Sequence, residues 1–130
     1  MKKIKITGGK HGNLFQLYES LGGEVCLEKI LLRFYETMST DIMIGFFFDG
    51  KSKDELRHIA MMQKAFLMKA WGACESYSGK PPAKAHQKLP PILTGHFNRR
   101  LVILEQTLKE FNVSETDIHT WLSFEDSFLA

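Results

Sequence analysis

Cysteine is scarce in this 130-residue chain, and net charge is nearly absent. The two cysteines, Cys26 and Cys74, are far apart and lack CxxC spacing, so the sequence indicates neither a disulfide framework nor a cysteine-based zinc site. The formal net charge is only +2, and no basic stripe with interleaved aromatic residues occurs. The composition therefore argues against nucleic acid as a partner.

Long apolar runs are absent as well. No stretch of the sequence approaches the about 20 apolar residues that a membrane-spanning helix needs. The lysine-rich start leads into glycines, whereas a signal peptide would continue into an apolar core. We therefore expect no membrane segment and a cytoplasmic location.

Phenylalanine is the residue type in excess, with ten copies. Aromatic side chains bury large areas, so this excess suits either a tight core or the walls of a large flat apolar pocket. A chain of 130 residues has the size of one domain. We predict a single domain over 1–130, with a loose lead-in over 1–13 where glycines cluster.

Apolar residues recur at helical spacing in most of the remaining sequence. The pattern predicts helices over 14–21, 24–39, 52–70, from just after Thr94 to 111, and from 115 onward, with Val25 and Phe111 counted among their apolar faces. The run IMIGFFF at 42–48 has the composition of a strand, but no other segment alternates convincingly enough to pair with it. We interpret this run as a compact corner with one or more phenylalanines turned inward. The predicted fold class is all-α.

Residues 77–91, YSGKPPAKAHQKLPP, lie between two long predicted helices and contain the histidine on which the interpretation centres. All four prolines lie here in two pairs, which mark the start and the end of a short helical segment that contains His86. Such a segment is too short to bury a core, but it could pack on a flat cofactor that a histidine binds. A neutral imidazole is the usual proximal ligand of haem iron in globins, and the alternative is a surface histidine.

Seven short motifs follow one another along the chain. They are LYESLGG at 17–23, RFY at 33–35, FFDG at 47–50, QKAFL at 63–67, YSG at 77–79, AH at 85–86 and HF at 96–97. Through these motifs and their separations, the chain resembles the truncated haemoglobins of bacteria, in particular the group I type. The resemblance implies a two-over-two helical sandwich around a b-type haem, with His86 as the proximal iron ligand.

The resemblance also implies roles around the haem. Tyr35 matches the family's distal tyrosine and Gln63 its distal glutamine, where both would donate hydrogen bonds to an iron ligand that carries negative charge. From the residues alone, Tyr35 could instead be an interface aromatic and Gln63 a solvated helix position. The remaining cofactor-binding candidates are Phe48, Ile59, Met62, Phe66 and Phe97, with Tyr77 and Lys84 near the haem propionates.

The sequence departs from the family's pattern in two places. The separation between Phe48 and Gln63 is longer than usual, which leaves open whether His58, Ile59 or Met62 faces the sixth coordination site of the iron. His58 is then either a helix-surface histidine or a candidate sixth ligand. The sequence LPPI at 89–92 is more similar to the group III branch of the same family.

We therefore expect a haem globin that reversibly binds dioxygen, and also nitric oxide and carbon monoxide, opposite His86. The same pocket would serve oxygen storage or transport, nitric oxide dioxygenation or peroxidase-like chemistry. Turnover would need an external reductase, since no flavin or nicotinamide motif occurs in the sequence. The alternative function is that of a haem-free helical sensor or interaction module that keeps the globin shell.

Overall fold

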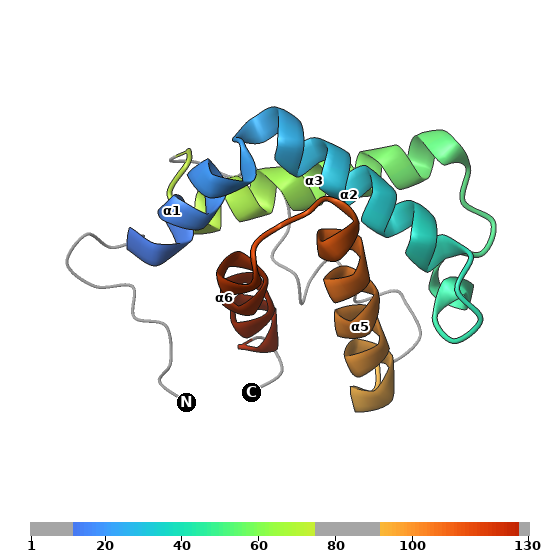
Figure 1. The fold of residues 1–130 in the computed structure, drawn as a ribbon. Coiled ribbons are helices and arrows are strands. Elements are labelled where there is room, and N and C mark those ends of the chain that lie inside the picture. The colour runs from blue at the N-terminus through green and yellow to red at the C-terminus, as the bar shows by residue number, and fades with distance from the viewer. Residues whose placement is uncertain (1–11, 75–91, 128–130) are drawn as a thin grey trace.

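The computed structural model describes residues 12–74 and 92–127 (Figure 1). In these residues the chain forms five α-helices and one 3₁₀ helix and no strand, which confirms the all-α prediction. The elements are α1 (Gly12–Leu21), α2 (Glu24–Ser39), η1 (Gly45–Phe48), α3 (Lys53–Ala70), α5 (Thr94–Glu110) and α6 (Glu115–Asp126). None of the described helices is long and apolar enough to cross a membrane.

Two helix pairs make up the fold. Figure 1 shows α2 and α3 crossing above α5 and α6. Within each pair, the two helices pack against each other. Helix α2 also packs on α5, and α1 packs on α6, so the two layers are joined at both ends. This is the two-over-two arrangement that the sequence resemblance implies.

The helix boundaries follow the local sequence signals. Gly22 and Gly23 end α1 with φ angles of 107° and 83°, a left-handed geometry that glycine adopts without strain. Ser52 begins α3 with a capping box, in which its side chain accepts from the backbone N–H of Glu55 and the Glu55 side chain accepts from the Ser52 N–H. Helix α1 begins at Gly12, earlier than predicted, and residues 1–11 of the predicted lead-in lie outside the described residues.

Two residues counted with the apolar faces are exposed. Val25 is 65% exposed because it lies only two residues from the fully buried Leu27, which places it on the opposite side of α2. Phe111 is 38% exposed because α5 ends before it and the chain turns away at Asn112, whose φ is 57°. The core consists of side chains with almost no exposure, among them Leu27, Ile30, Leu31, Phe34, Met38, Leu67, Trp71, Ile103, Leu104, Leu108 and Trp121.

The corner between α2 and α3 forms as predicted, with part of its phenylalanine run turned inward. Phe47 and Phe48 are half-buried and pack against the core, while Phe46 stays exposed on the outside. The rings of Phe46 and Phe47 stack at 4.2 Å, and both meet the ring of His96 at the start of α5 edge-on. Aromatic packing therefore joins this corner to α5.

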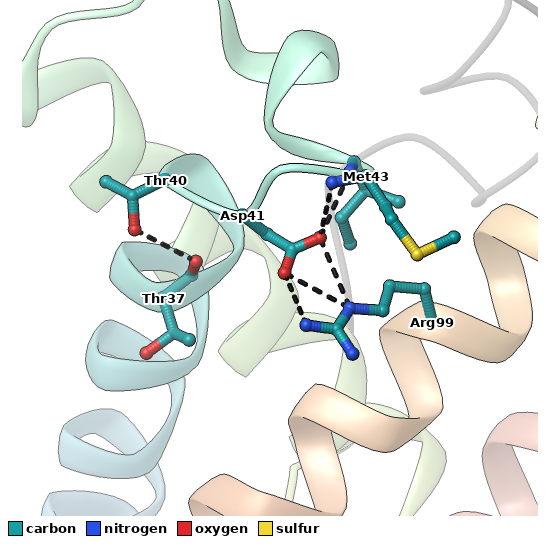
Figure 2. Close-up of polar contacts among 6 residues, drawn as sticks. Thr37, Thr40, Asp41, Met43 and Arg99 are labelled. Carbon is teal, nitrogen blue, oxygen red and sulfur yellow. Dashed lines mark hydrogen bonds and ion pairs between the residues drawn. The ribbon is translucent and has the colours of Figure 1, made fainter.

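An ion pair holds the same corner to α5. Arg99 Nη2 lies 2.7 Å from Asp41 Oδ1, and Asp41 Oδ2 accepts hydrogen bonds from the backbone N–H groups of Met43 and Ile44 at 2.9 and 3.1 Å (Figure 2). The hydrogen bond from Arg99 lowers the pKa of Asp41; partial burial opposes this effect and the two backbone N–H groups add to it. A single carboxylate thus fixes both the turn and the position of α5.

Replacing Asp41 by Asn should remove an acid-sensitive part of the stability. A carboxyl whose pKa is lowered on folding stabilises the protein above its ordinary pKa of about 3.9, and this contribution disappears as the pH falls through the lowered value. Urea denaturation followed by circular dichroism should therefore show Asp41→Asn to be less stable than the wild type near neutral pH. That difference should shrink as the pH falls below about 4.

The matched control is Asp49→Asn, which changes an exposed carboxylate at the end of the same corner. It should leave the free energy of unfolding nearly unchanged at each pH. A wild-type advantage over Asp41→Asn that stayed constant into acid would show that the carboxylate charge of Asp41 does not stabilise the corner.

Candidate functional site

Helix α3 presents one side to α2. Ala60 and Leu67 are its two fully buried residues, and they lie on the side that packs on α2. Lys64, between them, pairs with Glu24 and Glu28 of α2 at 2.8 and 3.0 Å. These partly exposed pairs contribute little stability singly, but they fix which side of α3 faces α2.

A second side of α3 carries the predicted site residues. Ile59, Met62, Gln63 and Phe66 follow one another at steps of three and one, and all four are half-buried. Beyond α2, the described helices make at most slight contact with α3. The link from this helix to α6 runs through Trp71, whose ring meets that of Trp121 edge-on at 4.9 Å. An apolar side of α3 with one amide on it is therefore only half covered by the described helices.

Tyr35 lies on α2, where it is buried with 8% exposure. Its ring meets the ring of Phe48 edge-on at 6.0 Å and that of its neighbour Phe34 at 5.4 Å. Burial raises the pKa of the Tyr35 hydroxyl, while the nearby guanidinium of Arg100 acts in the opposite direction. The structure thus brings together Tyr35 and Phe48, two of the predicted site residues, from different elements.

Arg100 and Glu125 are two site residues that sequence reasoning missed. Arg100 forms an ion pair with Glu125, and the side chains are only 21% and 4% exposed. Glu125 also accepts a hydrogen bond from Trp121 Nε1 at 3.0 Å, and the Arg100 guanidinium lies over the Phe34 ring at 5.1 Å. The signal was present, because both charged residues occupy positions on the apolar faces of their helices.

The other predicted site residues are divided between half-buried, exposed and undescribed positions. Phe97 is half-buried on α5. His58 is exposed and borders a surface depression of about 290 Å³ together with Lys51, Asp54, Glu55 and Ile59. In this structure it is therefore a helix-surface histidine, the first of its two predicted alternatives. His86, Tyr77 and Lys84 lie outside the described residues.

The chemistry of this residue set fits a haem. A porphyrin needs apolar and aromatic walls, which Ile59, Met62 and Phe48 provide with half-buried side chains. A ligand on the distal side of the iron needs hydrogen-bond donors, which Tyr35 and Gln63 carry. Since the porphyrin supplies four of the iron ligands, no cluster of protein ligands is required, and no group of three His, Cys, Asp or Glu side chains near enough to hold a metal occurs in the described part.

Comparison with known proteins gives the same assignment from independent evidence. The family model described as bacterial-like globin matches residues 16–128. A group 1 truncated haemoglobin of Chlamydomonas moewusii is 34% identical over 105 residues, which are 80% of this chain and 60% of that protein. A group 1 truncated haemoglobin of Synechocystis is 37% identical over 103 residues, with 76% of this chain and 80% of that protein covered.

Solved structures agree in the fold. A truncated haemoglobin of Tetrahymena pyriformis superposes with a TM-score of 0.73 at 28% identity, covering 86% of this chain and 92% of that one. The two-over-two haemoglobin of Synechococcus, solved in the cyanomet state with covalently attached haem, gives 0.72 at 27% identity and covers 85% and 89%. Together with the helix arrangement, these matches show that the chain belongs to the bacterial-like globin family as a truncated haemoglobin, a haem-binding protein.

Proposed function

We propose that this protein holds a b-type haem through His86 and reversibly binds dioxygen, and also nitric oxide and carbon monoxide, on the opposite side of the iron. The observation that carries the proposal is the burial of Tyr35 among aromatic rings, with its hydroxyl beside a guanidinium. The guanidinium can serve only the acceptor side of the hydroxyl, so the phenol proton still needs an acceptor, and a ligand with negative charge would supply one.

The haem iron, when bound, supplies the site that takes diatomic gases and places negative charge on dioxygen. The chain supplies the surroundings of that site. Tyr35 and Gln63 donate hydrogen bonds toward the distal ligand, and the half-buried side chains of Ile59, Met62 and Phe66 keep water away. The hydroxyl and the amide therefore favour ligands that carry charge, while the apolar side chains keep the local dielectric low.

The longer separation between Phe48 and Gln63 bears on which side chain faces the iron. His58 is exposed, whereas Ile59 and Met62 are half-buried, so an apolar side chain is the better candidate to face the sixth coordination site. An iron without a sixth protein ligand is open to a gas molecule. We therefore favour reversible ligand binding over an iron that His58 blocks.

The absorption spectrum tests the cofactor and its ligand. Purified wild type should show an intense Soret band in the ferric form, and this band should shift on reduction and again on addition of carbon monoxide. His86→Ala should lose the band or bind haem with a changed spectrum, because the proximal imidazole is removed.

The control for this test is His119→Ala, a change at an exposed histidine of α6 that should keep the wild-type spectrum. If haem-reconstituted wild type and His86→Ala gave the same spectra in all three states, His86 would not be the iron ligand. If neither protein took up haem, the haem-free interaction module would become the better account.

The rate of dioxygen release tests the role of Tyr35. Losing one hydrogen bond in a dry pocket costs ~1–2 kcal/mol, so Tyr35→Phe should release dioxygen roughly tenfold faster in stopped flow. Tyr18→Phe, which removes the hydroxyl of a half-buried tyrosine on α1, should leave the rate unchanged. Equal release rates for wild type and Tyr35→Phe would remove Tyr35 from the ligand site.

A further inference from the structure

The buried ion pair between Arg100 and Glu125 needs an explanation beyond stability. Glu125 uses both carboxylate oxygens, one for Arg100 and the other for Trp121 Nε1 at 3.0 Å, and its side chain is only 4% exposed. Removing two charges from water costs several kcal/mol each, and well-packed apolar residues in their place are often equally or more stable. A charge pair in the core of α5 and α6 therefore suggests a purpose other than holding the two helices together.

The guanidinium of Arg100 is held in one orientation from three sides. Glu125 binds it on the α6 side, the ring of Phe34 lies under it at 5.1 Å, and the Tyr35 hydroxyl lies within hydrogen-bonding reach. Phe34 and Tyr35 are neighbours on α2 with rings 5.4 Å apart. The cluster formed by Arg100, Glu125, Phe34 and Tyr35 therefore connects α6, through α5, to the predicted ligand-binding tyrosine.

The donor inventory of this cluster excludes one direction for the tyrosine proton. Arginine has five N–H donors and no acceptor, whereas a phenol has one proton and can also accept. The guanidinium of Arg100 therefore offers the phenol proton no acceptor, and the proton must point away from it. A cation beside the phenol oxygen also makes that proton a stronger hydrogen-bond donor.

We propose that Arg100 is a positioning residue for Tyr35, which Glu125 and Phe34 hold in place so that the phenol proton is directed at the distal ligand of the haem iron. The inference rests on the proposed ligand-binding role of Tyr35 and adds a class of favoured ligands. Small ligands with negative charge on their outer atoms, such as azide on ferric iron, gain from the directed proton. Carbon monoxide on ferrous iron, which carries little charge, gains much less.

The test variant removes the cation without leaving a buried charge unpaired. Arg100→Leu alone would leave the carboxylate of Glu125 without its partner, so it is combined with Glu125→Gln, whose amide oxygen still accepts from Trp121. This pair variant is compared with Tyr35→Phe, with the triple variant that combines all three changes, and with Glu125→Gln alone. Arg100→Lys is the conservative variant, because lysine keeps both the charge and a donor.

Azide and carbon monoxide titrations of the haem-loaded proteins give the first readout. The pair variant should bind azide roughly tenfold more weakly, about as weakly as Tyr35→Phe, and the triple variant should be no weaker than Tyr35→Phe. Carbon monoxide affinity should change much less, and Arg100→Lys should keep most of the azide affinity. Glu125→Gln alone keeps Arg100 but removes the carboxylate that holds it, so its azide affinity should fall between those of the wild type and the pair variant.

A readout without ligand turnover comes from nuclear magnetic resonance of protein labelled with carbon-13 at the tyrosine ring carbon that bears the hydroxyl. The Tyr35 signal, assigned by its absence in Tyr35→Phe, should shift in the pair variant and stay near its wild-type position in Arg100→Lys, which keeps the cation. If the pair variant did not fold, Arg100→Gln with Glu125→Gln would take its place with the same expected results, since it keeps polar groups at both positions.

Three results would overturn the inference. The first is wild-type azide affinity in the pair variant, and the second is an unmoved Tyr35 signal in that variant. The third is a triple variant whose loss of azide affinity equals the product of the losses in the pair variant and in Tyr35→Phe, because that result means that Arg100 acts on the anion independently of Tyr35. These results differ from a failure of the proposed function. Tyr35→Phe with wild-type dioxygen release would reject the role of Tyr35 itself, whereas a large Tyr35→Phe effect beside an inert pair variant would reject only the role of Arg100.

Discussion

The packing of α2 against both layers is the constraint on which the rest of the structure depends. Its buried face meets α3 through Ala60 and Leu67 and also packs on α5, so one helix fixes the separation of the two layers. The ion pair between Asp41 and Arg99 then sets the direction in which the chain leaves α2. Tyr35, on the same helix, is thereby placed between the aromatic corner and the charge pair of the lower layer.

The candidate site combines two opposite kinds of environment. One is apolar, formed by the ring of Phe48 against Tyr35 and by half-buried residues on α3, and its chemistry suits the flat face of a porphyrin. The other is a buried ion pair whose guanidinium lies beside the phenol. A low dielectric strengthens hydrogen bonds beside such a pair, and under our proposal this strengthening in ligand binding offsets the cost of burying the charges.

The sequence predicted most of the fold because helix signals are local. Gly22 and Gly23, the start of the helical pattern at Ser52 and the apolar spacing of α2 each depend on a few neighbouring residues, and these boundaries were confirmed. Spacing within one helix places Arg100 and Glu125 on apolar faces, but it does not reveal that they pair, because the pairing depends on how α5 packs on α6. Val25 was assigned wrongly because its residue type was given more weight than its position, two residues from Leu27 and hence on the opposite side of α2.

The most direct test of the central claim, that Tyr35 presents a proton to the distal ligand, is the infrared stretching frequency of carbon monoxide bound to the reduced protein. A donor or positive charge near the outer oxygen draws electron density from the iron into the ligand and weakens its bond. The account predicts a lower C–O frequency in wild type than in Tyr35→Phe, and the same upward shift when Arg100 and Glu125 are replaced together. A wild-type frequency identical to that of Tyr35→Phe would contradict it.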